Sequence, residues 1–130
     1  MRCGTRKGHD ITIGGRTHYG GVLVRSLEMK NGEIIDGCSL CVDRILKICH
    51  ETYPEIDSVA TLVSHPKFKQ DAWDQKAIMH LGELPKSAKK FTLYKRPRVG
   101  LSDKWPDFRD RPYRYCVSST HLYFILLPTS

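Results

Sequence analysis

The chain has 130 residues, a hydrophobic content of 40% and a formal net charge of +7. This length predicts one domain with a modest core of its own, so we expect a single domain over residues 1–130. The composition excludes a disordered chain, and no apolar stretch approaches the ~18 residues that a bilayer span needs, so no membrane partner is expected.

The first half of the chain predicts a β-hairpin followed by a helix. Residues 17–28 indicate a strand after a glycine-rich turn, and residues 33–36 indicate the return strand. Asn31 and Gly32 between them favour a type I′ turn, which needs positive φ at both central residues. A helix is expected over residues 39–53, where apolar side chains recur with the helical period. They are Val42, Ile45, Leu46 and Cys49.

The second half predicts one buried strand, one helix and three further strands. The apolar run 58–63 favours a strand, and residues 71–81 favour a helix capped by Asp71. The three later strands are expected at residues 91–94, 113–117 and 122–127, with a basic loop over 97–112. The fold class expected is therefore α+β, a single compact domain with a largely antiparallel sheet and two helices.

The excess of positive charge lies in one segment, residues 86–114, which holds ten Lys or Arg and three Asp or Glu. We call it the basic aromatic segment, because five aromatic residues are interleaved with the cations. Cations neutralise phosphates and flat rings stack on bases, although a solvated basic face would carry the same charges. We therefore expect nucleic acid, DNA or RNA, as the partner. The aromatic residues are Phe91, Tyr94, Trp105, Phe108 and Tyr113.

Two motifs, one inside this segment and one that ends a residue beyond it, resemble the C-terminal signature of the alkyladenine (3-methyladenine) DNA glycosylases, P-R-[IV]-G-[IL] followed by P-x-R-[FY]. They are P-R-V-G-L at residues 97–101 and R-D-R-P-Y-R-Y at residues 109–115. V-L-V-R-S-L-E at residues 22–28 is similar to that family's V-L-I-R-A-x-E strand, and residues 37–48 resemble its following helix more loosely. The resemblance covers about a third of the chain. It implies that Arg25, Arg98 and Arg114 match arginines of the family, with Arg25 near the active-site water or a backbone phosphate.

The resemblance does not extend to the family's catalytic glutamate, which lies in an E-x-E-A-Y segment. No glutamate occurs among the 21 residues before Val22, and in such enzymes that group activates water against the sugar of a flipped base. We therefore expect nucleic-acid binding without base excision or a cofactor, and no catalytic residue is assigned. The residues expected to contact nucleic acid are Arg25, Lys89, Lys90, Lys95, Arg96, Arg98, Lys104, Trp105, Arg109, Arg111 and Arg114.

Five cysteines, an odd number, together with an N-terminus that lacks an apolar signal, favour an intracellular reducing compartment: nucleus, cytoplasm or organelle matrix. Cys38 and Cys41 form a C-x-x-C pair, but a structural zinc site usually takes two such pairs. No metal is therefore expected. If the chain did bind one, Cys38 and Cys41 would be the candidate ligands. A redox role for the pair stays open, as does the reading of Cys41 and Cys49 as buried apolar residues.

Two other functions fit parts of the sequence. The chain could be a non-enzymatic RNA-binding subunit of a larger ribonucleoprotein or protein assembly, with the apolar residues 122–127 docking on a partner. The order hairpin, helix and Cys41-Val42-Asp43 is also similar to the start of zinc-dependent nucleoside deaminases, in which zinc lowers the pKa of a bound water. The P-C-x-x-C that supplies the remaining ligands in those enzymes is absent.

Overall fold

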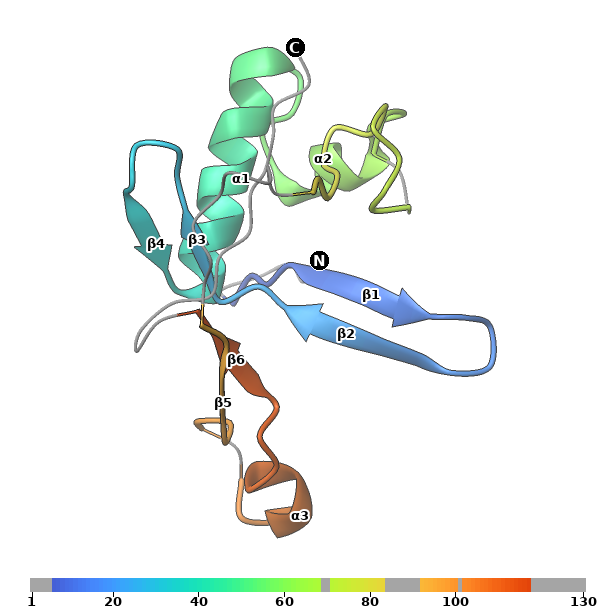
Figure 1. The fold of residues 1–130 in the computed structure, drawn as a ribbon. Helices are drawn as coiled ribbons and strands as arrows, with labels where there is room; N and C mark the ends of the chain where they lie inside the picture. The colour runs from blue at the N-terminus through green and yellow to red at the C-terminus, as the bar shows by residue number, and fades with distance from the viewer. Residues whose placement is uncertain (1–5, 69–70, 84–91, 101, 118–130) are drawn as a thin grey trace.

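The computed structural model describes residues 6–68, 71–83, 92–100 and 102–117. It confirms the expected α+β class with antiparallel strand pairing (Figure 1). The described strands form three separate two-stranded sheets instead of one larger sheet. In chain order the elements are β1 (Asp10–Gly14), β2 (Tyr19–Leu23), β3 (Ser26–Glu28), β4 (Ile34–Asp36), α1 (Cys38–Thr52), α2 (Val59–Ser64), β5 (Tyr94–Arg96), α3 (Pro106–Arg109) and β6 (Arg114–Cys116).

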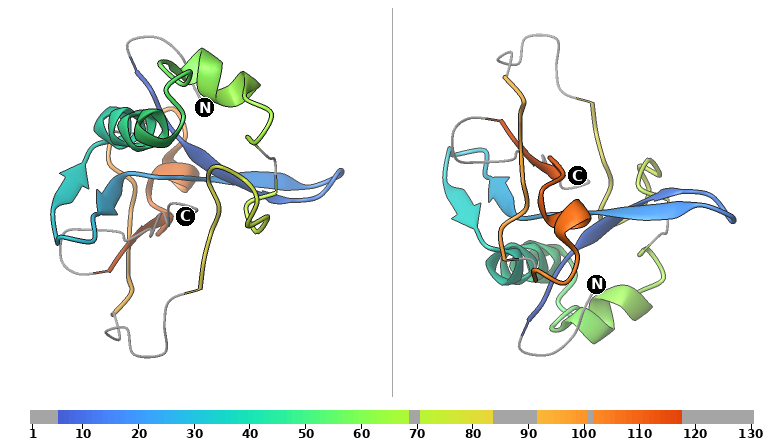
Figure 2. Two further views of the ribbon diagram at one scale, coloured as in Figure 1. Left: turned by 90° about the horizontal axis from the view of Figure 1, so that it is seen from above. Right: turned by 90° about the horizontal axis from the view of Figure 1, so that it is seen from below.

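The α1 helix organises the structure. It packs against β3 and β4 on one side and against α2 on another. The β1–β2 hairpin and the β5–α3–β6 unit extend away from it in different directions (Figures 1 and 2). The second of these units contains most of the described part of the basic aromatic segment, so the candidate site lies outside the core.

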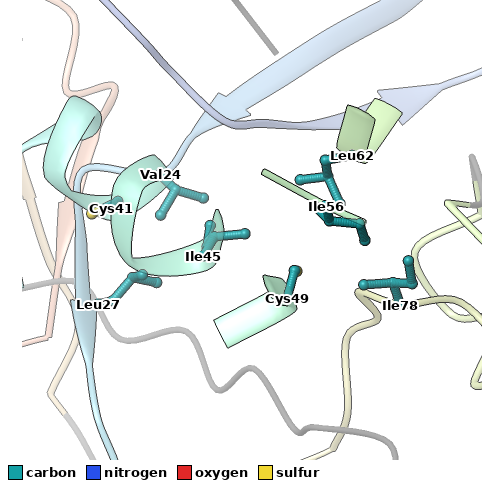
Figure 3. Packing of buried hydrophobic residues seen from close by; sticks show 8 residues of the cluster. All are labelled: Val24, Leu27, Cys41, Ile45, Cys49, Ile56, Leu62 and Ile78. Atoms are coloured by element: carbon teal, nitrogen blue, oxygen red, sulfur yellow. The ribbon is translucent and has the colours of Figure 1, made fainter. Parts of the chain in front are cut away.

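The helix predicted over 39–53 is confirmed as α1, with its apolar stripe turned inward. Gly37 precedes it as the N-cap, and Tyr53, followed by Pro54, ends it. Burying an aliphatic side chain contributes about 1.5–3 kcal/mol, so this stripe supplies much of the stability of a chain of this size. The core cluster, drawn in Figure 3, comprises Val24, Leu27, Cys41, Ile45, Cys49, Ile56, Leu62 and Ile78.

The hairpin predicted around Asn31 and Gly32 is confirmed as β3–β4. The strand predicted over 17–28 is wrong as a single strand, because it is divided into β2, which pairs with β1, and β3. The type I′ turn is also wrong. Only Gly32 has a positive φ, of 83°, and Asn31 does not. The Gly32 N–H donates to the Met29 carbonyl and the Met29 N–H to the Glu33 carbonyl, each at 2.8 Å. This is a three-residue loop with a glycine bulge, which needs one left-handed residue instead of two.

The strand predicted over 58–63 is wrong, because these residues form the short helix α2. Ser58 and Thr61 build a capping box: the Thr61 N–H donates to Ser58 Oγ at 3.2 Å, and the Ser58 N–H to Thr61 Oγ1 at 2.9 Å. Val59 and Leu62, three residues apart, are buried together. A short apolar run fits a buried strand or helix equally well by pattern, and the cap decides for the helix.

The helix predicted over 71–81 is also wrong, and a series of turns takes its place. Asp71 does not cap a helix: its carboxylate accepts the Trp73 N–H at 2.9 Å, and Asp74 accepts the Lys76 N–H at 3.0 Å. Such local side-chain bonds compete with helical hydrogen bonds. Ile78 still reaches the core, but Trp73 is 65% exposed, so the expected apolar face is divided.

The structure confirms the strands predicted in the second half of the chain only in part. The predicted strand 113–117 is confirmed as β6, whereas the one predicted over 91–94 begins at Tyr94 and continues to Arg96 as β5. The segment 97–112, expected to be a loop throughout, contains the single-turn helix α3. The strand predicted over 122–127 lies outside the described residues.

Replacing Gly37 by alanine is expected to lower the free energy of unfolding by about 1–3 kcal/mol, because Gly37 enters α1 with φ 121° and ψ 132°. A Cβ there would meet Leu40 at an ordinary 3.7 Å, so the strain comes from the backbone alone. Urea unfolding measures the change. Gly15→Ala is the control, since a Cβ there meets nothing within 4 Å. Equal losses in both variants would contradict this reading of Gly37.

Candidate nucleic-acid interface

The β5–β6 pairing brings two arginines directly opposite each other. Tyr94 pairs with Cys116, Lys95 with Tyr115, and Arg96 with Arg114. Directly opposed side chains in an antiparallel pair have Cβ atoms about 4.5–5.5 Å apart, and like charges there destabilise the sheet. Both arginines are exposed, and neither forms an ion pair with any described residue. An anion between or beside them would relieve this repulsion.

Lys95 and Tyr115 form the neighbouring cross-strand pair, where the lysine ammonium lies 5.7 Å from the centre of the tyrosine ring. Successive side chains of a strand point to opposite faces. This pair therefore occupies the face of the hairpin opposite to Arg96 and Arg114. The cation–π contact leaves the lysine charge uncompensated by any carboxylate among the described residues.

An open pocket with a volume of about 410 Å³ lies in the connection between β5 and β6. The described residues that line it are Arg98, Ser102, Trp105 and Phe108. Trp105 is 68% exposed and Phe108 51% exposed. Arg98 and Lys104 are exposed too, and within the described ranges neither is ion-paired. The pocket thus combines aromatic surface with uncompensated positive charge.

Arg109 differs from the other predicted contact residues because its charge is already compensated. It donates to Asp103 at 2.6 Å and to Asp110 at 2.7 Å, and these bonds raise the pKa of its guanidinium above the usual range. Together they connect the two ends of the turn that carries α3. The structure therefore favours Arg109 as a residue that holds this turn, instead of the phosphate contact expected from the sequence.

Arg111 is held by aromatic neighbours. Its guanidinium carbon lies 5.3 Å from the centre of the Phe108 ring and 5.9 Å from that of Tyr113, and Arg111 Nη1 donates to the Tyr113 hydroxyl at 3.0 Å. That hydrogen bond raises the pKa of Arg111 above its ordinary value. The side chain keeps its charge while its plane is oriented, as suits a phosphate contact.

Arg25 lies on another segment of the chain, between β2 and β3. Its carbonyl accepts the Gly37 N–H at 2.8 Å, which connects it to the start of α1. The side chain is exposed and pairs with neither Glu28 nor Glu33, because Glu33 accepts from Arg44 at 2.6 Å. Arg25 thus has no carboxylate partner among the described residues, and it is distant in sequence from β5 and β6. Lys89 and Lys90 lie outside the described residues.

The C-x-x-C pair occupies the first turn of α1. The Cys41 side chain is fully buried and its thiol donates to the Ile35 carbonyl at 3.7 Å, whereas Cys38 is half-buried. Burial raises the pKa of both Cys41 and Cys49 to about 11. No three His, Cys, Asp or Glu side chains gather in a metal-binding group within the part of the chain that the structure describes. Cys41 and Cys49 are therefore buried core residues.

The geometry also bears on the deaminase-like alternative. Asp43, which would replace the proton-shuttling glutamate, forms an ion pair with Lys7. Cys41, which would be the zinc ligand, points into the core. The residues at this position therefore do not fit a zinc-bound water.

Cys41 and Cys49 are expected to react with iodoacetamide far more slowly in the folded chain than in urea, because only the thiolate is a nucleophile. At about pH 8, a thiol with a pKa of about 11 is almost wholly protonated, and the thiolate forms only as the pH rises toward that value. Peptide mass spectrometry after timed alkylation measures each site. Labelling of Cys41 as rapid as that of half-buried Cys38 would contradict this burial.

Comparison with known proteins gives one relative and no family. The chain is 34% identical over 130 aligned residues to a protein of Acanthamoeba polyphaga mimivirus, "Uncharacterized protein L759". The alignment covers 89% of this chain and 56% of the viral protein, so the chain spans little more than half the relative's length. No family model matches the chain. No solved structure matches it. None of the described helices has the length and apolar character to cross a lipid bilayer.

Proposed function

We propose that this chain binds nucleic acid through the basic aromatic segment, gripping the phosphate backbone with the exposed cations of the β5–α3–β6 unit. The observation that carries the proposal is the direct opposition of Arg96 and Arg114 without a described carboxylate partner. Such a pair weakens the hairpin in isolation and strengthens it when a polyanion is bound. Phosphates are the natural counter-charge, because each arginine can donate to phosphate oxygens with two parallel N–H groups.

Two further observations support a nucleic acid over other polyanions. Exposed rings lie among the cations, at Trp105, Phe108 and Tyr113, and large exposed aromatic surface is costly in water unless a partner covers it. The same unit contains both motifs that resemble the C-terminal signature of the alkyladenine DNA glycosylases. We therefore propose that this chain is a reduced relative of that family, which keeps the contacts to the nucleic-acid backbone.

The activity proposed for these 130 residues is binding and not base excision. Residues 1–130 contain no E-x-E-A-Y segment like the one that holds the catalytic glutamate of the resembled family. Hydrolysis of a glycosidic bond would need a carboxylate that activates water on the sugar of a flipped base. We therefore expect that the purified chain releases no alkylated base from methylated DNA that it binds.

Salt dependence tests the proposal directly. Fluorescence anisotropy of a labelled DNA or RNA strand, and of the matching duplex, is measured with the full chain between about 50 and 200 mM salt. Each phosphate that the protein neutralises adds about 0.7–0.9 to the slope of log affinity against log salt, so contacts from several arginines and lysines give a steep line. A flat response, or no binding even at low salt, would refute it. Comparing the strands decides between DNA and RNA.

A further inference from the structure

We propose that the pocket formed by Arg98, Ser102, Trp105 and Phe108 is a subsite for one unpaired nucleobase of a single-stranded nucleic acid. This inference rests on the proposed function and adds the form of the ligand. The pocket's volume of about 410 Å³ falls in the range of ~300–1,000 Å³ that is usual for small-molecule sites, and two of the four described residues that line it are aromatic. Stacking on a ring is the interaction that every base can make.

The chain builds this pocket locally. The Phe108 N–H donates to the Trp105 carbonyl at 3.1 Å, and Pro106 occupies the first position of α3, where its missing N–H is no loss. Trp105 is the N-cap of α3 and Phe108 lies within its single turn, and both residues line the pocket. The Lys104 N–H donates to Ser102 Oγ at 3.2 Å, which orients the Ser102 side chain that also lines the pocket.

The surrounding charges favour an anionic ligand despite the acidic residues of the turn. Asp103 and Asp110 share Arg109, whose charge compensates one of their two negative charges and holds both carboxylates to its own side chain. The remaining carboxylate, Asp107, interacts electrostatically with Arg111. Arg98 lines the pocket itself and has no carboxylate partner within the described ranges. It is therefore available to the phosphate that joins the stacked base to its neighbour.

An unpaired base fits this arrangement better than a duplex does. The bases of a duplex are stacked on one another, and their ring faces are inaccessible to Trp105 and Phe108. Phosphates alone would be bound by Arg98 but would leave both rings in water. A base on the rings with its phosphate at Arg98 uses the aromatic and the cationic part of the pocket at once.

The test compares a labelled oligothymidine of about 12 nucleotides with an abasic strand of the same length and charge, by anisotropy with the full chain. Wild type is expected to bind oligothymidine about 5- to 150-fold more tightly than the abasic strand, the usual effect of base–aromatic stacking. Trp105→Ala should remove most of that preference, Trp105→Phe should keep most of it, and Trp73→Ala should leave it unchanged. Trp73 is the matched control because it is 65% exposed, against 68% for Trp105.

A second readout does not depend on affinity. In a Trp73→Phe background, Trp105 is the only tryptophan, and its fluorescence should be quenched when oligothymidine saturates the protein but much less with the abasic strand. Equal quenching by both strands, or a preference that survives Trp105→Ala, would overturn the subsite while leaving nucleic-acid binding intact. Failure of both strands to bind at low salt would overturn the proposed function and the subsite with it.

Discussion

Reversing the charge of Arg96, Arg98 and Lys104 to glutamate is expected to weaken nucleic-acid binding by at least about 100-fold near 0.1 M salt. Each lost phosphate contact removes about 0.7–0.9 from the salt slope, which corresponds to several-fold in affinity per contact at that salt concentration. Glutamate also adds repulsion from the phosphates. Anisotropy at several salt concentrations measures the affinity and the slope, which should fall by about two to three.

The loss should not come from unfolding. All three side chains are exposed, and none forms an ion pair with a described residue. Glu at position 96 would face Arg114 across the hairpin, and an opposite-charge pair at such a position contributes about 0.2–1 kcal/mol to stability. The thermal unfolding midpoint of this variant should therefore stay near that of wild type.

A matched variant controls for net charge. Lys30, Lys47 and Lys76 are exposed, and within the described ranges none is ion-paired. They lie in the β3–β4 turn, on α1 and in the 71–81 turns, away from the β5–α3–β6 unit. Replacing all three by glutamate changes the formal charge by the same amount, but should cost little affinity and leave most of the slope. Equal losses in the two triple variants would mean that binding depends on overall charge and not on this unit.

Ile45→Ala is expected to lower the free energy of unfolding by about 2–5 kcal/mol. Ile45 lies on the inner face of α1 at 1% exposure, among Val24, Leu62 and the other core residues drawn in Figure 3. Removing its methyl and methylene groups loses burial and leaves a cavity that the surrounding residues fill only in part. For a chain whose stability is on the order of 5–15 kcal/mol, this is a large fraction.

Leu40→Ala, on the same helix, is the control for that prediction. Leu40 is 58% exposed, so a similar loss of side chain there should change the free energy of unfolding much less. Urea unfolding followed by far-ultraviolet circular dichroism measures both variants. If the two substitutions cost the same, α1 does not form the centre of the core.

The sequence predicted α1 well because three signals agree there. The apolar stripe keeps the helical period from Val42 to Cys49, Gly37 breaks the preceding strand, and Pro54 follows the last turn. The prediction from the sequence was wrong at α2 and at residues 71–81. Those segments are short, and local side-chain hydrogen bonds decide their structure. Ser58 with Thr61 makes a helix cap, whereas Asp71 and Asp74 make turns. Hydrophobic periodicity does not detect either arrangement.

The candidate site was predictable in composition but not in geometry. The location of the charge is a property of the sequence, and the resemblance to the glycosylase signature added Arg98 and Arg114. The register that opposes Arg96 to Arg114 depends on how the 17 intervening residues close the hairpin, and no local pattern determines this. The ion pairs of Arg109 with Asp103 and Asp110 could have been suspected from their spacing, yet only the turn around α3 brings all three together.

Photo-cross-linking tests the central claim, that nucleic acid binds to the basic aromatic segment, most directly. A single strand carrying photoreactive thymidine analogues is irradiated with the full chain at low salt, and the adducts are mapped by peptide mass spectrometry. We expect adducts within residues 86–114, above all at Trp105 or Phe108, which line the pocket. Adducts confined to the β1–β2 hairpin or to α1, with none in that segment, would contradict it.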